Sequence, residues 1–408
     1  MTDNSIMNQV RGFLLILLSL GISGCAGAGR PVEVEMAGVD ELAELEELPD
    51  PFVMNDGRRV ETEADWRRRR EEIKAMLLYY QYGHMPPEPK TITAIELSCE
   101  TVYGGAATKK HILLSLGPEG AVKINVGMII PEGDGPFAVI LKNDRRIFNV
   151  PIAEEIVKRG YIVADYVRTD LDPDKKDTVG PAQAAYADYD WGTLAVWAWG
   201  GMRVIDYLMT LDVVDKDRIA FTGQSRGGKT ALLAGSLDER IGLVAPNGSG
   251  CGGAGCYRFE GKGAETLERI TAPERFSYWF HRRFRDFADK ETKLPFDQHF
   301  LKALVAPRAL ISIDGLGDLW ANPYGTQQSH RGAQPVFEFL GAGEKLGIYF
   351  RSGGHAQNED DWRTLIDFAD KVFFGKMPAS GKRFDQLPFP SAPRPFSWSV
   401  PKVRESGR

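Results

Sequence analysis

The sequence predicts an α/β fold, a three-layer sandwich in which helices cover both faces of a mostly parallel central sheet. From residue 136 onward, short apolar runs of strand length alternate with segments of helical periodicity. Such alternation places crossover helices on both faces of a parallel sheet. The chain has 408 residues, of which 43% are hydrophobic, so it is long and apolar enough to bury a large core.

The expected elements follow from this periodicity. A helix over 66–82 and antiparallel strands between 91 and 130 precede the alternating region. The expected strands of that region cover residues 137–141, 161–167, 218–222, 241–245, 309–313 and 347–351. The expected helices cover residues 152–159, 191–211, 225–237 and 361–374, and His299 and His330 also fall within helical patterns.

The first residues predict export. Arg11 precedes an apolar run over 13–22, which ends in Ser23-Gly24-Cys25. This pattern is typical of a signal peptide and too short for a membrane span. Residues 20–25 resemble a bacterial lipobox, which implies cleavage before Cys25 and lipid attachment to its sulfur. We expect a cell-envelope lipoprotein of the periplasm or outer membrane; the alternative is a plain secretory signal and a secreted protein.

The remaining organisation is simple. After the signal peptide of residues 1–25, we expect an acidic tether over 26–60, one folded domain over 61–390 and a C-terminal tail over 391–408.

The net charge of −6 gives no reason to expect a nucleic-acid partner. Cys251 and Cys256 form either a short disulfide loop or two buried small residues, and they lack the further ligands of a zinc site. We therefore expect no metal and no cofactor.

The most informative stretch is Gly223-x-Ser225-x-Gly227, between an expected strand and an expected helix. A serine at such a turn is held in a strained conformation that exposes its hydroxyl, and the helix N-terminus directs backbone N–H groups toward a developing oxyanion. The stretch predicts an α/β-hydrolase with Ser225 as nucleophile. A glycine-rich turn that binds nothing is the alternative; a phosphate-binding loop lacks the required spacing.

A serine nucleophile requires a base and an orienting acid, which follow it in the chain order serine, acid, histidine. His355 is the expected base because it lies between the last expected strand and the last helix. His299 and His330 lie inside expected helices, where a packed or solvated imidazole is more usual. Asp318 and Asp314, after the strand at 309–313, both remain candidates for the acid, and we favour Asp318.

Several linked motifs over about residues 135–375 resemble the glucuronoyl esterase family. The motifs are Gly223-Gln-Ser225-Arg226-Gly-Gly-Lys229, Ser249-Gly-Cys-Gly-Gly-Ala-Gly-Cys-Tyr-Arg258, Leu294-Pro-Phe-Asp-Gln-His299 with Leu304-Val-Ala-Pro-Arg308, and Asp318-Leu-Trp320-Ala-Asn-Pro323. The resemblance implies a serine esterase acting on esters of glucuronic or 4-O-methylglucuronic acid in glucuronoxylan, including links to lignin alcohols. An acetylxylan esterase or general carboxylesterase of the same fold is the alternative.

The resemblance also implies residue roles. Arg226 would help to hold the oxyanion, and Lys229 and Trp320 would contact the uronate sugar. Glu265 falls near a family position that hydrogen-bonds the sugar. Lys229 could instead be a surface lysine of the helix, and Glu265 a plain surface glutamate.

The sequence departs from the family pattern at two sites. Many members carry the catalytic acid as a glutamate at the position of Gly248, so the acid must come from elsewhere, and Asp318 can supply it. Fungal members carry a disulfide whose cysteines correspond to Gln224 and Ala356 here. A carbohydrate-binding lipoprotein with a decayed site is a further alternative, which only Gly248 favours.

Overall fold

The computed structural model describes residues 16–17, 36–378 and 380–402 and confirms the expected fold class. Ten strands form one sheet in the order β1-β2-β3-β4-β6-β5-β7-β8-β9-β10. From β6 to β10 the neighbouring strands are parallel. These strands are β5 (Phe137–Asp144), β6 (Tyr161–Val167), β7 (Val214–Gln224), β8 (Leu243–Asn247), β9 (Ala309–Gly315) and β10 (Leu346–Arg351).

The other end of the sheet is antiparallel, as the alternation between 91 and 130 predicts. β4 pairs antiparallel with β6 and connects the two parts of the sheet. The antiparallel strands are β1 (Ile16–Leu17), β2 (Ile92–Val102), β3 (Ala107–Leu116) and β4 (Val122–Pro131).

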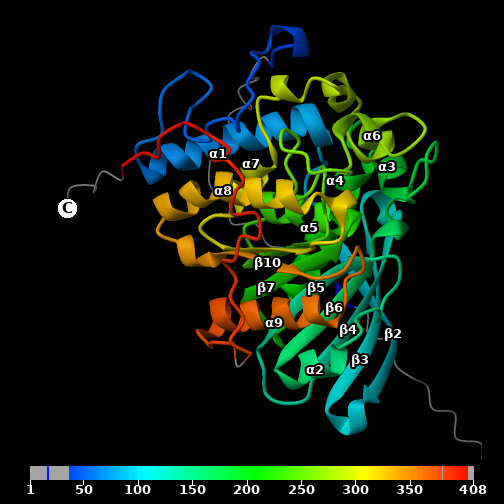
Figure 1. The fold of residues 1–408 in the computed structure, drawn as a ribbon. Coiled ribbons are helices and arrows are strands. Elements are labelled where there is room, and N and C mark those ends of the chain that lie inside the picture. Colours follow the sequence, from blue (N-terminus) through cyan, green and yellow to red (C-terminus); the bar gives the residue numbers. More distant parts are fainter. Residues whose placement is uncertain (1–15, 18–35, 379, 403–408) are drawn as a thin grey trace, which may run out of the picture.

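Helices cover both faces of the sheet (Figure 1). The larger layer contains α1 (Glu63–Leu77), α3 (Pro181–Ala185), α4 (Thr193–Leu208), α5 (Arg226–Leu237), α6 (Leu267–Thr271), α7 (Gln298–Val305) and α8 (Pro323–Phe339). The smaller layer contains α2 (Ala153–Lys158) and α9 (Glu359–Phe374). Each layer packs its own apolar cluster against the sheet. Burial of the helices on both faces excludes water from the sheet between them.

The expected elements are present, with shifted ends. The helix expected over 66–82 is α1 followed by a π-helical turn, Leu78–Tyr82. β7 begins four residues before its expected start, at Val214, because that residue pairs with Phe137 of β5. Short 3-10 turns join the elements: Val39–Glu41, Tyr103–Gly105, Pro118–Gly120, Arg168–Asp170, Ser277–Trp279, Arg282–Phe287, Glu291–Lys293, Leu319–Ala321 and Gly343–Lys345.

Residues 36–60 do not form the expected tether. Leu48 and Phe52 are fully buried. The Phe52 ring lies 5.4 Å from that of Phe339, and the Leu48 N–H donates to the carbonyl of Pro395 over 2.8 Å. The segment and the C-terminal tail therefore lie side by side on the domain, as the blue and red ribbons of Figure 1 show. The acidic composition of this segment predicted a free chain. Its few large apolar residues favour packing against the domain instead, because their burial removes apolar surface from water.

Most of the predicted signal peptide, including Cys25, lies outside the described residues; Ile16 and Leu17 form β1, which pairs with β2. Among the helices of the described segments, none is long and apolar enough to cross a bilayer. Cys251 and Cys256 are buried free thiols, and Cys99 is an exposed one. Across residues 36–378 and 380–402, no cluster of three or more His, Cys, Asp or Glu side chains could hold a metal ion.

Candidate active site

Ser225 occupies a strained turn between β7 and α5. Its backbone has φ 58° and ψ −123°, a left-handed conformation that a residue with a side chain rarely adopts. Its N–H donates to the carbonyl of Asn247 over 2.8 Å, which ties the turn to the end of β8. A Cβ atom at Gly223 would lie 2.4 Å from the carbonyl oxygen of Gly227, so the turn requires glycine there. The strained turn between strand and helix that the sequence predicts at Ser225 is therefore present.

Asn143 supports this turn from the end of β5 and was not predicted from the sequence. Its side chain is buried, and its Nδ2 donates to the carbonyls of Thr222 (3.2 Å) and Gly227 (2.8 Å). It thus joins the strand before Ser225 to the helix after it. An isolated asparagine at a strand end carries no distinctive sequence signal, because its partners are backbone groups brought close only by the sheet.

His355 and Asp318 are in direct contact. The Nδ1 atom of the imidazole lies 2.5 Å from Oδ2 of the carboxylate. The Asp318 side chain is buried, whereas that of His355 is 44% exposed. Gln224 donates from Nε2 to the carbonyl of His355 over 2.6 Å and holds the histidine loop beside the elbow.

Asp314, the other candidate acid, makes no contact with His355 among the described residues. It lies buried at the end of β9, where burial raises its pKa to about 6. The neighbouring Lys302 is also buried, and burial lowers its pKa to about 8. Asp314 is therefore part of the interior beneath the site, and of the two candidates Asp318 is the carboxylate that contacts the imidazole.

Ser225 and His355 open into a cavity of about 230 Å³. Six predicted site residues line it, namely Ser225, Arg226, Lys229, Glu265, Trp320 and His355. Asp318 lies behind the imidazole and not in the lining. The structure thus gathers these six residues from four separate segments of the chain around one space.

Lys229 and Glu265 are interior residues of this site. Only 3% of Lys229 and 4% of Glu265 are exposed, so the surface interpretation of each is wrong. The ammonium donates to the carbonyls of Ser249 (2.6 Å) and Cys251 and lies 3.6 Å from Oε2 of Glu265. Burial lowers the pKa of Lys229, and the Glu265 carboxylate opposes this shift. The pair places opposite charges at the cavity wall.

Arg226 is held by Asp174, a residue the sequence did not single out. The guanidinium forms an ion pair with the Asp174 carboxylate and lies 4.7 Å from the centre of the Trp279 ring. The same carboxylate accepts from Trp279 Nε1 and from the Tyr278 hydroxyl, each over 3.0 Å. Because Arg226 is the first residue of α5, its backbone N–H has no acceptor within the helix. This N–H is available to an oxyanion at Ser225.

An aromatic wall completes the cavity. Phe276 and Trp279 stack with ring centres 4.1 Å apart, and both line the space. Arg275 lies 5.1 Å from the centre of the Trp320 ring. Sequence reasoning missed Arg275, Phe276 and Trp279 because they lie in an irregular segment; the local run of aromatic residues was the available signal.

Gly248 lies beside the contact between His355 and Asp318. Its φ is +49°, and a Cβ atom there would lie 3.5 Å from Asp318 Oδ2 and 3.7 Å from His355 Nδ1. The position at which the resemblance expects a glutamate therefore faces the same imidazole nitrogen as Asp318. The ends of two different strands, β8 and β9, thus lie beside this atom.

A family model of fungal glucuronyl esterases matches residues 118–341, more than half of the chain. The chain belongs to the glucuronoyl esterase family. It is therefore a carboxylic ester hydrolase, and the resemblance stated from its motifs is confirmed.

The similarity of this chain to individual carbohydrate esterases and glucuronoyl esterases supports this assignment. A carbohydrate esterase of an unknown prokaryotic organism is 32% identical, over 80% of this chain and 90% of that protein. A solved carbohydrate esterase family 15 glucuronoyl esterase from Caldicellulosiruptor kristjansonii has a TM-score of 0.74 at 30% identity, over 89% of this chain and 99% of that one. The Sporotrichum thermophile glucuronoyl esterase, solved as an alanine variant with methyl 4-O-methyl-β-D-glucopyranuronate, has a TM-score of 0.69 at 25% identity, over 83% and 91%.

Proposed function

We propose that this glucuronoyl esterase cleaves esters of glucuronic or 4-O-methylglucuronic acid in xylan-type polysaccharide, including esters to lignin alcohols, through a Ser225–His355–Asp318 triad. One observation carries the proposal: Ser225 and His355 open into the cavity that contains the buried Lys229–Glu265 pair. A uronate offers hydroxyl groups and a ring face, and the cavity offers charged partners and stacked aromatic rings. The methyl 4-O-methylglucuronate bound by the Sporotrichum enzyme supports the same substrate class.

The reaction begins when His355 Nε2 accepts the proton of the Ser225 hydroxyl. The oxygen attacks the ester carbonyl, and the carbonyl π electrons move onto oxygen to give a tetrahedral oxyanion. Asp318 stabilises the imidazolium through Nδ1, and the Arg226 N–H donates to the oxyanion. Collapse breaks the bond to the alkoxy oxygen, which takes the proton from His355 Nε2. Water then cleaves the acyl-enzyme by the same steps and releases the uronate.

The deciding experiment compares two kinds of ester. Methyl and benzyl glucuronate are expected to be hydrolysed with kcat/KM well above that for acetylated xylan. In Ser225→Ala the activity on all of these esters is expected to disappear, and a fluorophosphonate probe should label the wild type but not the variant. Faster cleavage of acetylated xylan would contradict the uronate specificity and favour an acetylxylan or general carboxylesterase. Absence of labelling would favour a non-catalytic carbohydrate-binding protein.

We further propose that the protein is exported and anchored to the membrane through a lipid on Cys25. The lipobox-like residues 20–25 support this proposal. In a bacterial host, the wild type should incorporate radiolabelled palmitate and sediment with membranes, and Cys25→Ser should do neither. Release of unlabelled wild-type protein into the soluble fraction would indicate a plain secretory signal instead.

A further inference from the structure

We propose that a second cavity beside Ser225 and His355 is a subsite for the leaving alcohol, and that it selects alcohols carrying a carboxylate. This inference rests on the proposed function, because it assigns the uronate to the first cavity. The second cavity has a volume of about 450 Å³. Gln224 and Ala356, the chain neighbours of Ser225 and His355, both line it.

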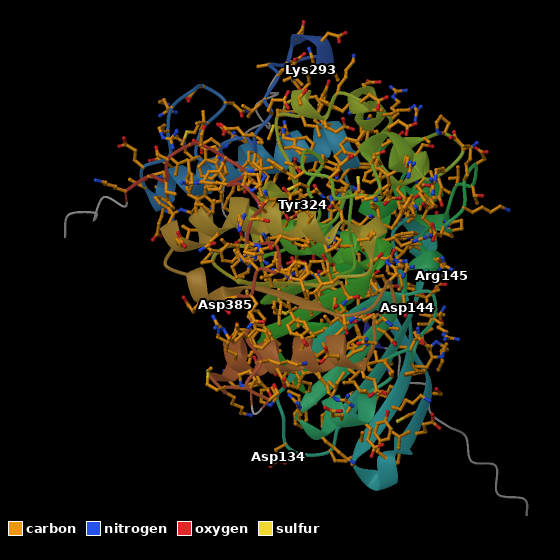
Figure 2. All side chains as sticks on the ribbon, in the orientation of Figure 1. Asp134, Asp144, Arg145, Lys293, Tyr324 and Asp385 are labelled. Atoms are coloured by element: carbon orange, nitrogen blue, oxygen red, sulfur yellow. The ribbon has the colours of Figure 1, made fainter. Side chains whose placement is uncertain are left out.

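The sheet order places the two cavities on opposite sides of β7. The first is lined by Gly248, after β8, and by Trp320, after β9. The second is lined by Asp144, at the end of β5, and by Arg168, directly after β6. Because β7 lies between β5 and β8, the Ser225 elbow stands between the two spaces. Asp144 and Arg145, labelled in Figure 2, mark the side of the second cavity.

The chemistry of ester cleavage indicates which part of the substrate each cavity would hold. The acyl group and the alcohol leave the carbonyl carbon in different directions, so a uronate in the first cavity directs the alcohol away from it. The alkoxy oxygen must also lie close to His355, which supplies its proton. The second cavity begins at Ala356 and Gln357, the residues that follow this histidine.

Arg168 gives the second cavity its chemical character. It lines the cavity although only 5% of its surface is exposed. Its hydrogen bond to the carbonyl of Asn143 is long at 3.4 Å, and its Nε has no acceptor in the described part of the chain. Among the described residues, no carboxylate lies within 4.0 Å of its guanidinium. Its guanidinium carbon lies 5.0 Å from the centre of the Trp197 ring, and Asp144 and Asp174 attract it from beyond ion-pair distance. A buried cation without an ion-pair partner is unfavourable, and a carboxylate matches the planar guanidinium with two hydrogen bonds.

The other charges of the lining are already paired. Lys142 donates to Asp144 (2.6 Å) and to the carbonyl of Asn149 (2.7 Å), and Asn149 donates back to Asp144. Phe148, Val150 and Trp362 add apolar surface for the carbon skeleton of the alcohol. Burial lowers the pKa of Arg168 to about 10, so the side chain remains charged at neutral pH. The lining therefore fits a ring-bearing alcohol with one anionic group.

The test compares benzyl glucuronate with its 4-carboxybenzyl counterpart. In the wild type we expect the carboxylated ester to have the higher kcat/KM, by roughly tenfold, through a lower KM. Arg168→Met should abolish this preference, and Arg168→Lys should retain part of it. Gln357→Glu adds a carboxylate to the lining and should reduce the preference without removing the buried arginine. Arg145→Met removes an exposed arginine of the neighbouring loop, outside the lining, and should keep the wild-type preference.

The outcomes separate this inference from the proposed function. Equal rates for the two esters in the wild type would overturn the subsite. A preference for the carboxylated ester that survives in both Gln357→Glu and Arg168→Met would also overturn the subsite. If the Arg168 variants do not fold, the result for Gln357→Glu alone decides whether the subsite exists. Failure to cleave either ester would contradict the proposed function instead. In that case 4-(hydroxymethyl)benzoate, compared with benzyl alcohol, should still slow fluorophosphonate labelling of Ser225; equal effects of the two alcohols would overturn the subsite.

Discussion

The Nδ1 atom of His355 lies 2.5 Å from Oδ2 of Asp318, and a Cβ atom at Gly248 would lie 3.7 Å from the same nitrogen. One imidazole atom thus faces the ends of two strands, β8 and β9. In this chain the β9 end supplies the carboxylate, and the β8 end carries a glycine with positive φ.

Asp318→Ala is expected to lower kcat/KM on benzyl glucuronate by roughly three to four orders of magnitude, because the imidazole loses the group that orients it and stabilises its charge. Asp314→Asn is the matched control. It removes a buried carboxyl that does not touch His355 and should retain most of the activity. A larger loss in Asp314→Asn than in Asp318→Ala would reverse the assignment of the acid.

Gly248→Glu should partly restore activity when combined with Asp318→Ser. The new side chain would start 3.7 Å from His355 Nδ1, and the serine would leave room for its carboxylate. Because φ is +49° at this position, the substitution should cost about 1–2 kcal/mol of stability, measurable by denaturant unfolding. A double variant no more active than Asp318→Ser would show that a carboxylate from the β8 end cannot serve this imidazole.

Asp174→Asn should weaken the positioning of the Arg226 side chain. The charge that holds the guanidinium disappears, while the shape of the side chain and part of its hydrogen bonding remain. We expect kcat/KM on methyl glucuronate to fall roughly tenfold, in the range of a charged hydrogen bond. Asp177→Asn is the control, because Asp177 is an exposed residue of the same loop. Equal activities of the two variants would argue against a positioning role for Asp174.

Acidification should destabilise the fold through His299. Burial lowers its pKa to about 4 from the usual 6.5. The unfolded chain therefore binds a proton that the folded chain resists, so stability is complete above pH 6.5 and is lost as the pH falls towards 4. The full effect is about 3 kcal/mol. The free energy of unfolding of His299→Gln should change less over this interval than that of the wild type, and His84→Gln, at an exposed site, should keep most of the slope. Parallel curves for His299→Gln and the wild type would contradict this cause.

The sequence by itself determined the features that depend on neighbouring residues. The alternation of strands and helices predicted the sheet, because each element must bury one apolar face. The Ser225 turn could be recognised because its glycines, strand and helix are contiguous in the chain. Motifs read residue by residue also indicated the family, and the order of Ser225, Asp318 and His355 along the chain matched the order that the fold requires.

Only the tertiary structure decided contacts between residues far apart in the chain. It showed that Asp318, and not Asp314, reaches His355, because two loops after different strands meet there. It buried Lys229 against Glu265 and brought Asp174 to Arg226. It also docked residues 36–60 on the domain, although their composition predicted a tether. Such contacts depend on strand order and packing. These bring together side chains whose proximity no local sequence pattern indicates.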